Sequence, residues 1–249
     1  EMLRSLVGSE MCIRDRYWVD QAIESGGEVK VVQFHPSYSY EEFVEGIRPD
    51  SIEGPNGTKL ITYPVKYGIF RRLCDEASKH PNRRYVLIID EINRANLSRV
   101  FGELMYLLEY RDQEVPLAGG GVLGIPENVR IIGTMNTADR SIALVDHALR
   151  RRFAFLDLFP HFEVLRKYHA GRSDFDVEPL IEVLSEINNQ INDPHYAVGI
   201  SYFLQENLSS QIEDIWKMEI QPYLEEYFFD QPEKANQYAW EKIGTRIKP

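Results

Sequence analysis

Short apolar runs, separated by stretches with helical spacing, recur through the first 160 residues of the chain. Two of them, Tyr85–Ile89 and Val129–Gly133, predict strands that are buried in a parallel sheet. The run Val29–Phe34 is rich in β-branched residues and predicts a third strand, and Phe153–Leu158 predicts a fourth. Strands that alternate with helices are typical of an α/β fold with a parallel sheet.

The helices of this fold are predicted from the spacing of their apolar residues. Lys66–Lys79 and Leu97–Tyr110 place apolar side chains at intervals of three and four. A helix is also predicted from about Tyr17 to Ser25, and a short one over Leu144–Arg152. Together with the strands they predict a sheet flanked by helices.

Two connections differ from their surroundings in composition. His35–Leu60 predicts a long polar connection, of a kind that is usually functional or an insertion. Its aromatic residues Tyr38, Tyr40 and Phe43 either pack as local core or face a central pore or a partner. Val115–Ile125, with three glycines at its centre, predicts a hairpin.

After Pro160 the spacing becomes helical, over Phe162–Tyr168, Val177–Ile191 and Ile212–Phe229. We therefore expect an α/β core over residues 17–160. A smaller helical lid subdomain, with further helices at its C-terminal end, is expected over residues 161–249.

The first sixteen residues fit neither periodicity. Their run SLVGSEMCIRDR looks like translated sequencing-adapter sequence and does not resemble a secretory signal. We expect residues 1–16 to be a non-native segment and leave them out of the predicted fold.

Charge and cysteine content narrow the range of functions. The chain of 249 residues has 39 acidic and 28 basic side chains, a formal net charge of −11, and so repels phosphate backbones at long range. Cys12 and Cys74 lack metal-ligand spacing and favour a reducing compartment. No apolar run approaches the roughly 20 residues that a membrane-spanning helix needs. These features predict a soluble, cytoplasmic protein without a membrane partner.

Two acidic residues, Asp90 and Glu91, directly follow the predicted strand Tyr85–Ile89. Ligands of open parallel sheets bind at the carboxyl ends of the strands, where these acids would lie beside a nucleotide. The Asp90 carboxylate suits a magnesium ion, and Glu91, turned to the other side, suits the polarisation of an attacking water. Alternatively, the two acids only cap the next helix, where acidic residues are favoured.

Asn136 and three arginines are the other candidates. Asn136 follows the strand Val129–Gly133, where its amide can bond the same water or the terminal phosphate, or can simply be a turn residue. Arg150, Arg151 and Arg152 end a predicted helix. They either complement the helix dipole or include an arginine finger for a neighbouring subunit's nucleotide.

Three motifs in this order carry a family resemblance: DEINRAN from Asp90, GTMNTADRS over Gly133–Ser141 and ALVDHALRRRF over Ala143–Phe153. Together with FHPSYSYEEFVEGIRP and VGISYFL, they resemble the McrB family of the dynein-related AAA+ proteins. Members of that family are the motor subunits of 5-methylcytosine-dependent McrBC restriction systems. The resemblance extends over roughly residues 29–204.

The resemblance implies roles for individual residues. Asp90 and Glu91 would be the Walker B pair, with magnesium at Asp90, and Asn136 would be the sensor residue. Arg151 and Arg152 would be the candidates for an arginine finger that acts in trans across a ring interface.

Asp139 and Arg140 lie in the family's signature stretch. The resemblance implies that they order the same interface beside the nucleotide.

The sequence departs from the family at one point, because no G-x-x-x-x-G-K-[ST] occurs in it. The backbone N–H groups and the lysine of that loop hold the phosphates of a nucleotide. The family places the loop one helix before the strand that ends at Phe34, where residues 1–16 lie, so truncation is a better explanation than evolved loss. We expect this chain to bind nucleotide weakly or not at all, and to be inactive by itself.

For the full-length parent, the resemblance implies hydrolysis of GTP or ATP, with magnesium, in a homo-oligomeric ring. Hydrolysis would drive DNA translocation beside an McrC-like nuclease subunit, with DNA bound through a domain that is not present here. The sequence does not decide between GTP and ATP. Two alternative functions remain: a non-catalytic AAA+ ring subunit or adaptor, and an AAA+ chaperone or maturation factor.

Overall fold

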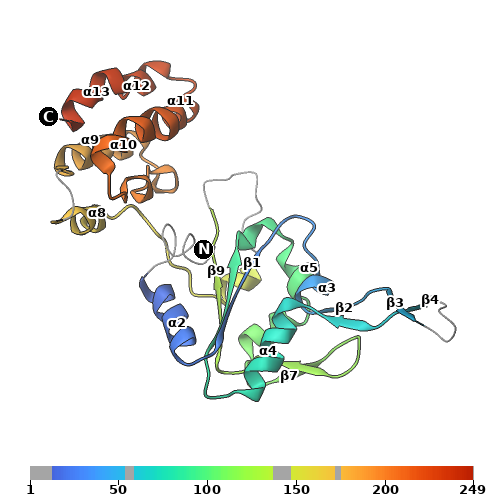
Figure 1. The fold of residues 1–249 in the computed structure, drawn as a ribbon. Helices are drawn as coiled ribbons and strands as arrows, with labels where there is room; N and C mark the ends of the chain where they lie inside the picture. Colours follow the sequence, from blue (N-terminus) through green and yellow to red (C-terminus); the bar gives the residue numbers. More distant parts are fainter. Residues whose placement is uncertain (1–12, 54–58, 137–146, 172–174, 249) are drawn as a thin grey trace. The chain divides into compact units, whose positions relative to one another are not determined.

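The computed structural model describes residues 13–53, 59–136, 147–171 and 175–248. The chain divides into two compact units, Glu1–Leu156 and Asp157–Pro249. Each unit has its own hydrophobic core, and Figure 1 shows the sheet in the first and the helices of the second.

A three-stranded parallel sheet forms the centre of unit 1. Its strands β1 (Glu28–Gln33), β6 (Tyr85–Asp90) and β9 (Val129–Gly133) lie in the order β1-β6-β9. Alternate residues of β6 enter the cores on opposite faces of the sheet, Leu87 and Ile89 on one and Val86 and Ile88 on the other. Burial on both faces explains the unbroken apolar run, and the predicted α/β parallel sheet is confirmed.

Helices cover both faces of this sheet. On one face, α2 (Ile13–Glu24) packs Val19 and Ala22 against the sheet. Because it begins at Ile13, the helix starts inside the segment 1–16 that is predicted to be non-native. On the other face lies α4 (Ile69–Lys79), which carries the buried Cys74. Burial raises the pKa of the Cys74 thiol to about 12.

The single helix predicted over Leu97–Tyr110 is wrong in one respect, because the structure has two helices in this segment. α5 (Leu97–Phe101) and α6 (Leu104–Glu109) meet at Gly102, whose φ is +50°. An added Cβ there would lie 3.1 Å from the Tyr40 ring. Glycine adopts this backbone conformation without steric cost, so the helix breaks although the apolar spacing continues.

The connection His35–Leu60, predicted as a long polar connection, contains regular structure. It holds the short helix α3 (Tyr40–Phe43) and the strands β2 (Glu45–Ile47), β3 (Asp50–Glu53) and, at its end, β4 (Lys59–Thr62). These strands are short and mostly exposed, so they lack the apolar pattern of the central sheet.

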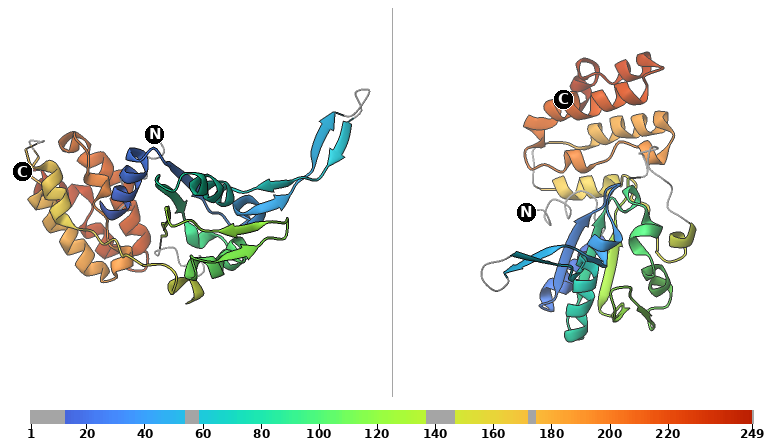
Figure 2. Two further views of the ribbon diagram at one scale, coloured as in Figure 1. Left: turned by 90° about the horizontal axis from the view of Figure 1, so that it is seen from below. Right: turned by 90° about the vertical axis from the view of Figure 1, so that its right-hand side faces the viewer.

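A ribbon of two antiparallel strand pairs follows from these elements. β2 pairs with β5 (Val65–Tyr67), and β3 pairs with β4. Figure 2 shows that the ribbon projects away from the central sheet. The helix predicted to begin at Lys66 begins only at Ile69, because Lys66 pairs with Gly46 in the ribbon.

The aromatic residues ahead of the ribbon pack as local core, which supports the first of their two interpretations. Phe43 is fully buried and stacks on Phe70, with ring centroids 5.1 Å apart. Tyr38 stacks on Phe34 at 4.7 Å. The Tyr40 hydroxyl donates to Glu103 at 2.6 Å, and burial, together with this bond, raises the pKa of Tyr40.

A buried ion pair joins the ribbon to α4 and to the predicted hairpin, which is present as β7 (Glu114–Pro116) and β8 (Val122–Gly124). Arg71 on α4 pairs with Glu45 on β2, and both side chains are almost inaccessible. The second Glu45 oxygen accepts the N–H of Gly119 in the hairpin turn at 2.9 Å. A Cβ at Gly119 would lie 2.7 Å from this carboxylate, which explains the glycine.

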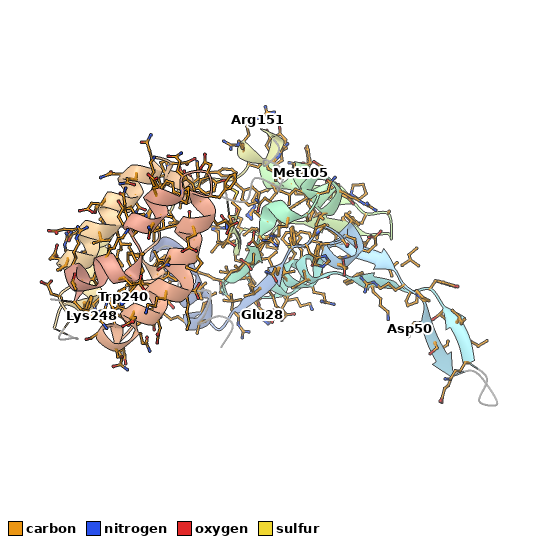
Figure 3. All side chains as sticks on the ribbon, turned by 90° about the horizontal axis from the view of Figure 1, so that it is seen from above. Glu28, Asp50, Met105, Arg151, Trp240 and Lys248 are labelled. Carbon is orange, nitrogen blue, oxygen red and sulfur yellow. The ribbon has the colours of Figure 1, made fainter. Side chains whose placement is uncertain are left out.

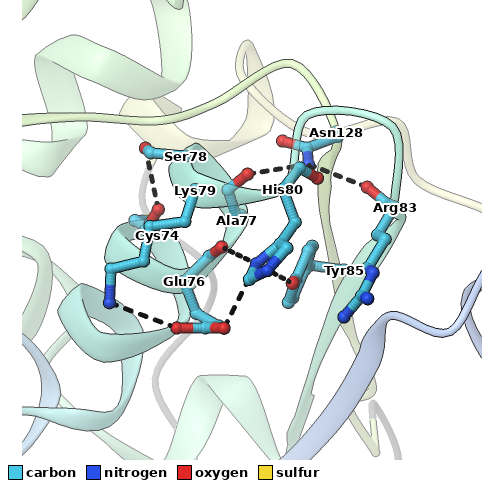
Figure 4. A network of polar contacts seen from close by, with 9 residues as sticks. All are labelled: Cys74, Glu76, Ala77, Ser78, Lys79, His80, Arg83, Tyr85 and Asn128. Atoms are coloured by element: carbon cyan, nitrogen blue, oxygen red, sulfur yellow. Dashed lines mark hydrogen bonds and ion pairs between the residues drawn. The ribbon is translucent and has the colours of Figure 1, made fainter.

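At the amino edge of the sheet, Asn128 connects α4 to the strands (Figure 4). Its amide donates to the carbonyls of Ala77, His80 and Arg83 at 2.8 to 3.1 Å. The backbone carbonyl of Asn128 accepts the N–H of Tyr85 at 2.9 Å. These bonds fix the end of α4 and the start of β6 relative to β9.

The strand predicted over Phe153–Leu158 is wrong. These residues form no strand, and Phe155 and Leu156 are exposed. In the part of the chain that the structure describes, the sheet ends at β9, so no strand borders this apolar run. The short helix before it, α7 (His147–Arg150), coincides with the end of the predicted helix Leu144–Arg152.

Unit 2 is helical, as predicted. Its α-helices are α8 (Phe162–His169), α9 (Glu178–Ile191), α10 (Leu208–Ile215), α11 (Gln221–Tyr227), α12 (Pro232–Gln237) and α13 (Trp240–Ile247). A π-helical turn, Trp216–Ile220, joins α10 to α11. Pro222 has no N–H for the regular helical bond, which accounts for a wider turn at this point.

The VGISYFL segment of unit 2 is held by two buried or half-buried side chains. The amide of Asn188 accepts the N–H of Val198 at 2.7 Å and donates to its carbonyl at 3.2 Å. His169 Nε2 lies 2.8 Å from the carbonyl oxygen of Phe203.

None of the described helices, in either unit, combines the length and apolar character that crossing a membrane requires.

We expect Glu45→Gln to lower the free energy of unfolding by about 3–5 kcal/mol, because it leaves the buried Arg71 charge without its close partner and with only the half-exposed Asp75 carboxylate 4.0 Å away. The matched control is Asp50→Asn in the same ribbon, where Asp50 and Lys66 form a 2.8 Å ion pair that is half exposed. That variant should change stability little, since solvent screens the pair. Urea unfolding followed by circular dichroism measures both, and equal losses would contradict the role given to burial.

Candidate functional site

The two acids lie at the carboxyl edge of the central sheet, where Asp90 ends β6 and Glu91 follows it. The parallel pairing continues past the last strand residues. Thr134 donates its N–H to the Ile89 carbonyl and accepts the N–H of Ile92 at its own carbonyl, both at 2.9 Å. The backbone that carries the two acids is therefore hydrogen-bonded to Thr134 on either side of the pair, at Ile89 and at Ile92.

Thr134 also contacts both acids through its side chain. Its hydroxyl donates to Asp90 Oδ1 at 2.7 Å and accepts the N–H of Glu91 at 3.3 Å. Sequence reasoning missed this residue. In the sequence, only its place as the first residue after the strand next to β6 points to it. It could be selected only if the register of the two strands were known.

Glu91 has an unusual backbone conformation, with φ 53° and ψ 47°. A residue with a Cβ pays about 1–2 kcal/mol to adopt this left-handed region. Such strain is concentrated at functional sites, where the surrounding structure imposes it. The conformation ends the extended backbone of β6 at Glu91.

The Glu91 carboxylate retains unused capacity to accept hydrogen bonds. Its Oε2 atom is shielded from solvent and lies 3.3 Å from Arg94 Nε, an ion-pair contact without hydrogen-bond geometry. A shielded carboxylate oxygen of this kind is suited to accept a proton or bind a water.

Asn136 reaches the same edge as the acids. The Asn93 amide donates to the Asn136 carbonyl at 3.4 Å, which connects the residue after β9 to the turn after β6. Asn93 Oδ1 is buried and has no hydrogen-bond partner among the described residues. Asn93 is a second polar residue of this edge that sequence reasoning did not single out.

The acids do not cap the helix that follows them. A 3₁₀ turn, Ile92–Arg94, comes first, and the side chain of Glu91 makes no capping hydrogen bond to it. The N-cap of α5 is Asn96, whose Oδ1 accepts the N–H of Arg99 at 3.1 Å. The alternative interpretation of the acids as helix caps is therefore not supported.

The three consecutive arginines lie in three different surroundings. The Arg150 guanidinium lies over the Phe155 ring, 5.6 Å from its centroid. Arg152 is largely buried and pairs with Glu109 at the end of α6, at 2.7 Å. Arg151 is exposed, and Figure 3 shows it at the periphery of unit 1.

Asp139 and Arg140 lie outside the described residues. Within the described ranges, no group of three acidic, histidine or cysteine side chains is placed to hold a metal ion. A magnesium ion at Asp90 would therefore take most of its oxygen ligands from water and from a bound phosphate, which is usual for this ion.

Comparison with known families agrees with this architecture. A family profile described as an AAA domain of the dynein-related subfamily matches residues 18–153. The chain belongs to this AAA family. A second profile, described as the alpha-helical lid domain of McrB, matches residues 179–236, so the chain is an McrB-like AAA protein with an McrB lid.

Two curated relatives come from restriction systems. The Type IV methyl-directed restriction enzyme EcoKMcrB subunit of Escherichia coli K12 is 41% identical over 240 residues, 87% of this chain and 50% of the relative. The Type II restriction enzyme BsuMI component YdiS of Bacillus subtilis 168 is 29% identical over 160 residues, 50% of this chain and 46% of the relative. The chain thus spans about half the length of these relatives.

We expect Glu91→Gly to raise the free energy of unfolding of unit 1 by about 0.5–1 kcal/mol. Glycine removes the left-handed strain but loses more chain entropy on folding. The control is Asn192→Gly, at the other described non-glycine residue with positive φ, where asparagine already tolerates this conformation. Thermal unfolding measures both. A Glu91→Gly variant less stable than the parent would contradict this expectation, because the strain would then be smaller than the entropy cost of glycine.

Proposed function

We propose that this chain is the motor domain of a nucleoside-triphosphate-hydrolysing protein from an McrB-like restriction system. The observation that carries the proposal is the convergence of Asp90, Glu91 and Asn136 at one edge of the sheet. The acids are connected there through Thr134, and Asn136 through Asn93.

The three residues have separate roles in this proposal. Asp90 holds magnesium, which would neutralise charge on the phosphates. Glu91 accepts a proton from the attacking water, for which its shielded Oε2 atom is suited. Asn136 hydrogen-bonds the water or the terminal phosphate.

The phosphates would enter beside α2. This helix precedes β1 and runs in the opposite direction, so its N-terminal end lies toward the carboxyl edge of the sheet (Figure 1). A loop ahead of it would present backbone N–H groups to an anion at that edge. The sequence contains no G-x-x-x-x-G-K-[ST], and we propose that the chain binds nucleotide weakly without it.

We also propose that the domain works in a ring of identical subunits, with Arg151 as the arginine finger. Arg151 is exposed, whereas Arg152 is held by Glu109 inside the unit. Asp139 and Arg140 would order the interface at the nucleotide. The names of the relatives support a role in restriction, and we propose GTP or ATP as substrate, an McrC-like nuclease subunit as partner and DNA as the track of the motor.

The second candidate function is a non-catalytic ring subunit or adaptor. In this role the domain keeps the AAA fold but does not turn nucleotide over. The two functions differ in whether nucleotide turnover depends on Glu91.

The test uses a chain in which a strand and a G-x-x-x-x-G-K-[ST] loop are joined ahead of α2, called the loop-bearing chain. We expect it to hydrolyse GTP or ATP with magnesium, and Glu91→Gln to reduce turnover by roughly 10²- to 10⁴-fold, the usual contribution of a general base. Nucleotide affinity should stay nearly unchanged, because Glu91 does not hold the phosphates.

Phosphate release measures turnover, and a nucleotide-dependent thermal shift measures binding. The chain without the loop is the control and should show little shift. Turnover that survives Glu91→Gln would refute the water-activating role, and an intact loop without any turnover would favour the adaptor.

For the arginines, we expect Arg151→Ala to abolish hydrolysis of the nucleotide that the neighbouring subunit of the ring binds. A loop-bearing chain with Arg151→Ala retains its own acids, and one with Glu91→Gln retains its arginine. Mixed rings of the two should recover activity that neither has alone, because an arginine finger contributes about 10³- to 10⁵-fold to the rate.

Arg150→Ala is the matched control for this experiment. Its guanidinium lies over Phe155, so its loss should leave turnover within a few-fold of the parent. Failure of every mixture to recover activity would argue that the Arg151 segment acts only within its own subunit.

A further inference from the structure

Thr134 lies where the two halves of the candidate site meet, and its side chain contacts both acids. It follows β9 directly, two residues before Asn136 and one residue beyond the last register pair of the two strands, Ile89 with Gly133. Its backbone bonds to Ile89 and Ile92, the residues on either side of the acid pair. A displacement of the Asn136 segment along the backbone therefore moves Thr134 and, through its bonds, the acids.

The side chain of Thr134 uses both functions of its hydroxyl. The O–H donates to Asp90 Oδ1 at 2.7 Å, a charge-assisted bond, and a lone pair accepts the Glu91 N–H at 3.3 Å. Bonds in such a chain strengthen one another by polarisation. The branched Cβ restricts the side chain to few rotamers, so the hydroxyl holds its position at little entropic cost.

The two bonds have different consequences. The bond to Asp90 occupies one carboxylate oxygen and directs the group, which leaves the other oxygen for a cation or its water. The bond to the Glu91 N–H holds the backbone at the residue with the strained φ of 53°. A strained conformation persists only when neighbouring groups impose it.

Close packing at the end of β9 reinforces this arrangement. A Cβ added at Gly133 would lie 2.9 Å from Ile92 Cδ1, so the strand end already lies against the turn that carries the acids. A side chain at that position would require the Ile92 side chain to move.

We propose that Thr134 is the positioning residue of the acid pair and couples Asn136 to it. Its hydroxyl orients the Asp90 carboxylate and holds Glu91 in its left-handed conformation. The proposal rests on the proposed function only for the chemistry that the acids perform, because the positioning itself exists in the chain without nucleotide.

The test measures amide hydrogen exchange at Glu91 in the chain as it stands. Thr134→Val keeps the shape of the side chain and removes both bonds. We expect it to accelerate exchange of the Glu91 N–H about tenfold, the effect of one ordinary hydrogen bond. Thr134→Ser keeps the hydroxyl and should stay within about threefold of the parent.

Two internal controls separate positioning from a general loss of stability. The N–H of Phe34, which donates to the Asp90 carbonyl at the same edge, should exchange at an unchanged rate in Thr134→Val. Thr62→Val removes a threonine hydroxyl that donates to the Asp50 carbonyl in the exposed ribbon and should leave Glu91 unaffected. If Thr134→Val does not fold, Thr134→Ala reports on the same hydroxyl.

Two exchange results would overturn the proposal. One is an unchanged Glu91 rate in Thr134→Val, and the other is a Thr134→Ser rate as fast as that of Thr134→Val, which would assign the effect to the methyl group.

Turnover of the loop-bearing chain provides the second measurement. Thr134→Val should lower kcat with little change in KM, and Thr134→Ser should restore it. If Glu91→Gln lowers turnover but Thr134→Val leaves kcat unchanged, the positioning role is refuted. If turnover survives Glu91→Gln, the proposed function fails, whereas the exchange result still decides the role of Thr134.

Discussion

The arrangement of unit 1 depends on the pairing of β6 with β9, which continues beyond the last residue of each strand. Because β6 is buried on both faces, its position is fixed from both sides of the sheet. The backbone bonds of Thr134 then carry this order into the turn that bears Asp90 and Glu91. Polar groups that would be mobile in an ordinary loop are held at the rim of a rigid sheet.

The central part of the fold could be predicted from sequence because its pattern reflects burial directly. A run such as Tyr85–Ile89 is apolar at every position only when both faces of a strand are covered. The ribbon over residues 45–67 gives no such pattern, since its strands are short and exposed. The break at Gly102 also escapes a periodicity argument, because the helices on both sides keep their apolar faces toward the same core. The strand predicted over Phe153–Leu158 is wrong for a different reason. These residues form an apolar run, but such a run forms a strand only where a neighbouring strand pairs with it.

For the candidate site, residue type and topology placed Asp90, Glu91 and Asn136 at one edge of the sheet, and the family resemblance was needed to propose roles for them. Parallel strands bring their carboxyl ends to one edge, so residues after two adjacent strands must lie close together. Thr134 and Asn93 could not be selected in the same way. Their importance depends on the register between β6 and β9 and on the left-handed turn at Glu91, neither of which the sequence specifies. The distinct surroundings of Arg150, Arg151 and Arg152 likewise arise from tertiary contacts with Phe155 and Glu109.

The contact of Glu45 with Arg71 and Gly119 has a consequence for the order of folding. The three residues come from the ribbon, α4 and the hairpin, separated along the chain by 26 residues in one case and 74 in the other. Contacts so distant in sequence form late, because a long segment of chain must first be closed. The charged pair is complete only when the ribbon, α4 and the hairpin have come together, so it cannot stabilise the ribbon before the segment up to the hairpin turn has been synthesised.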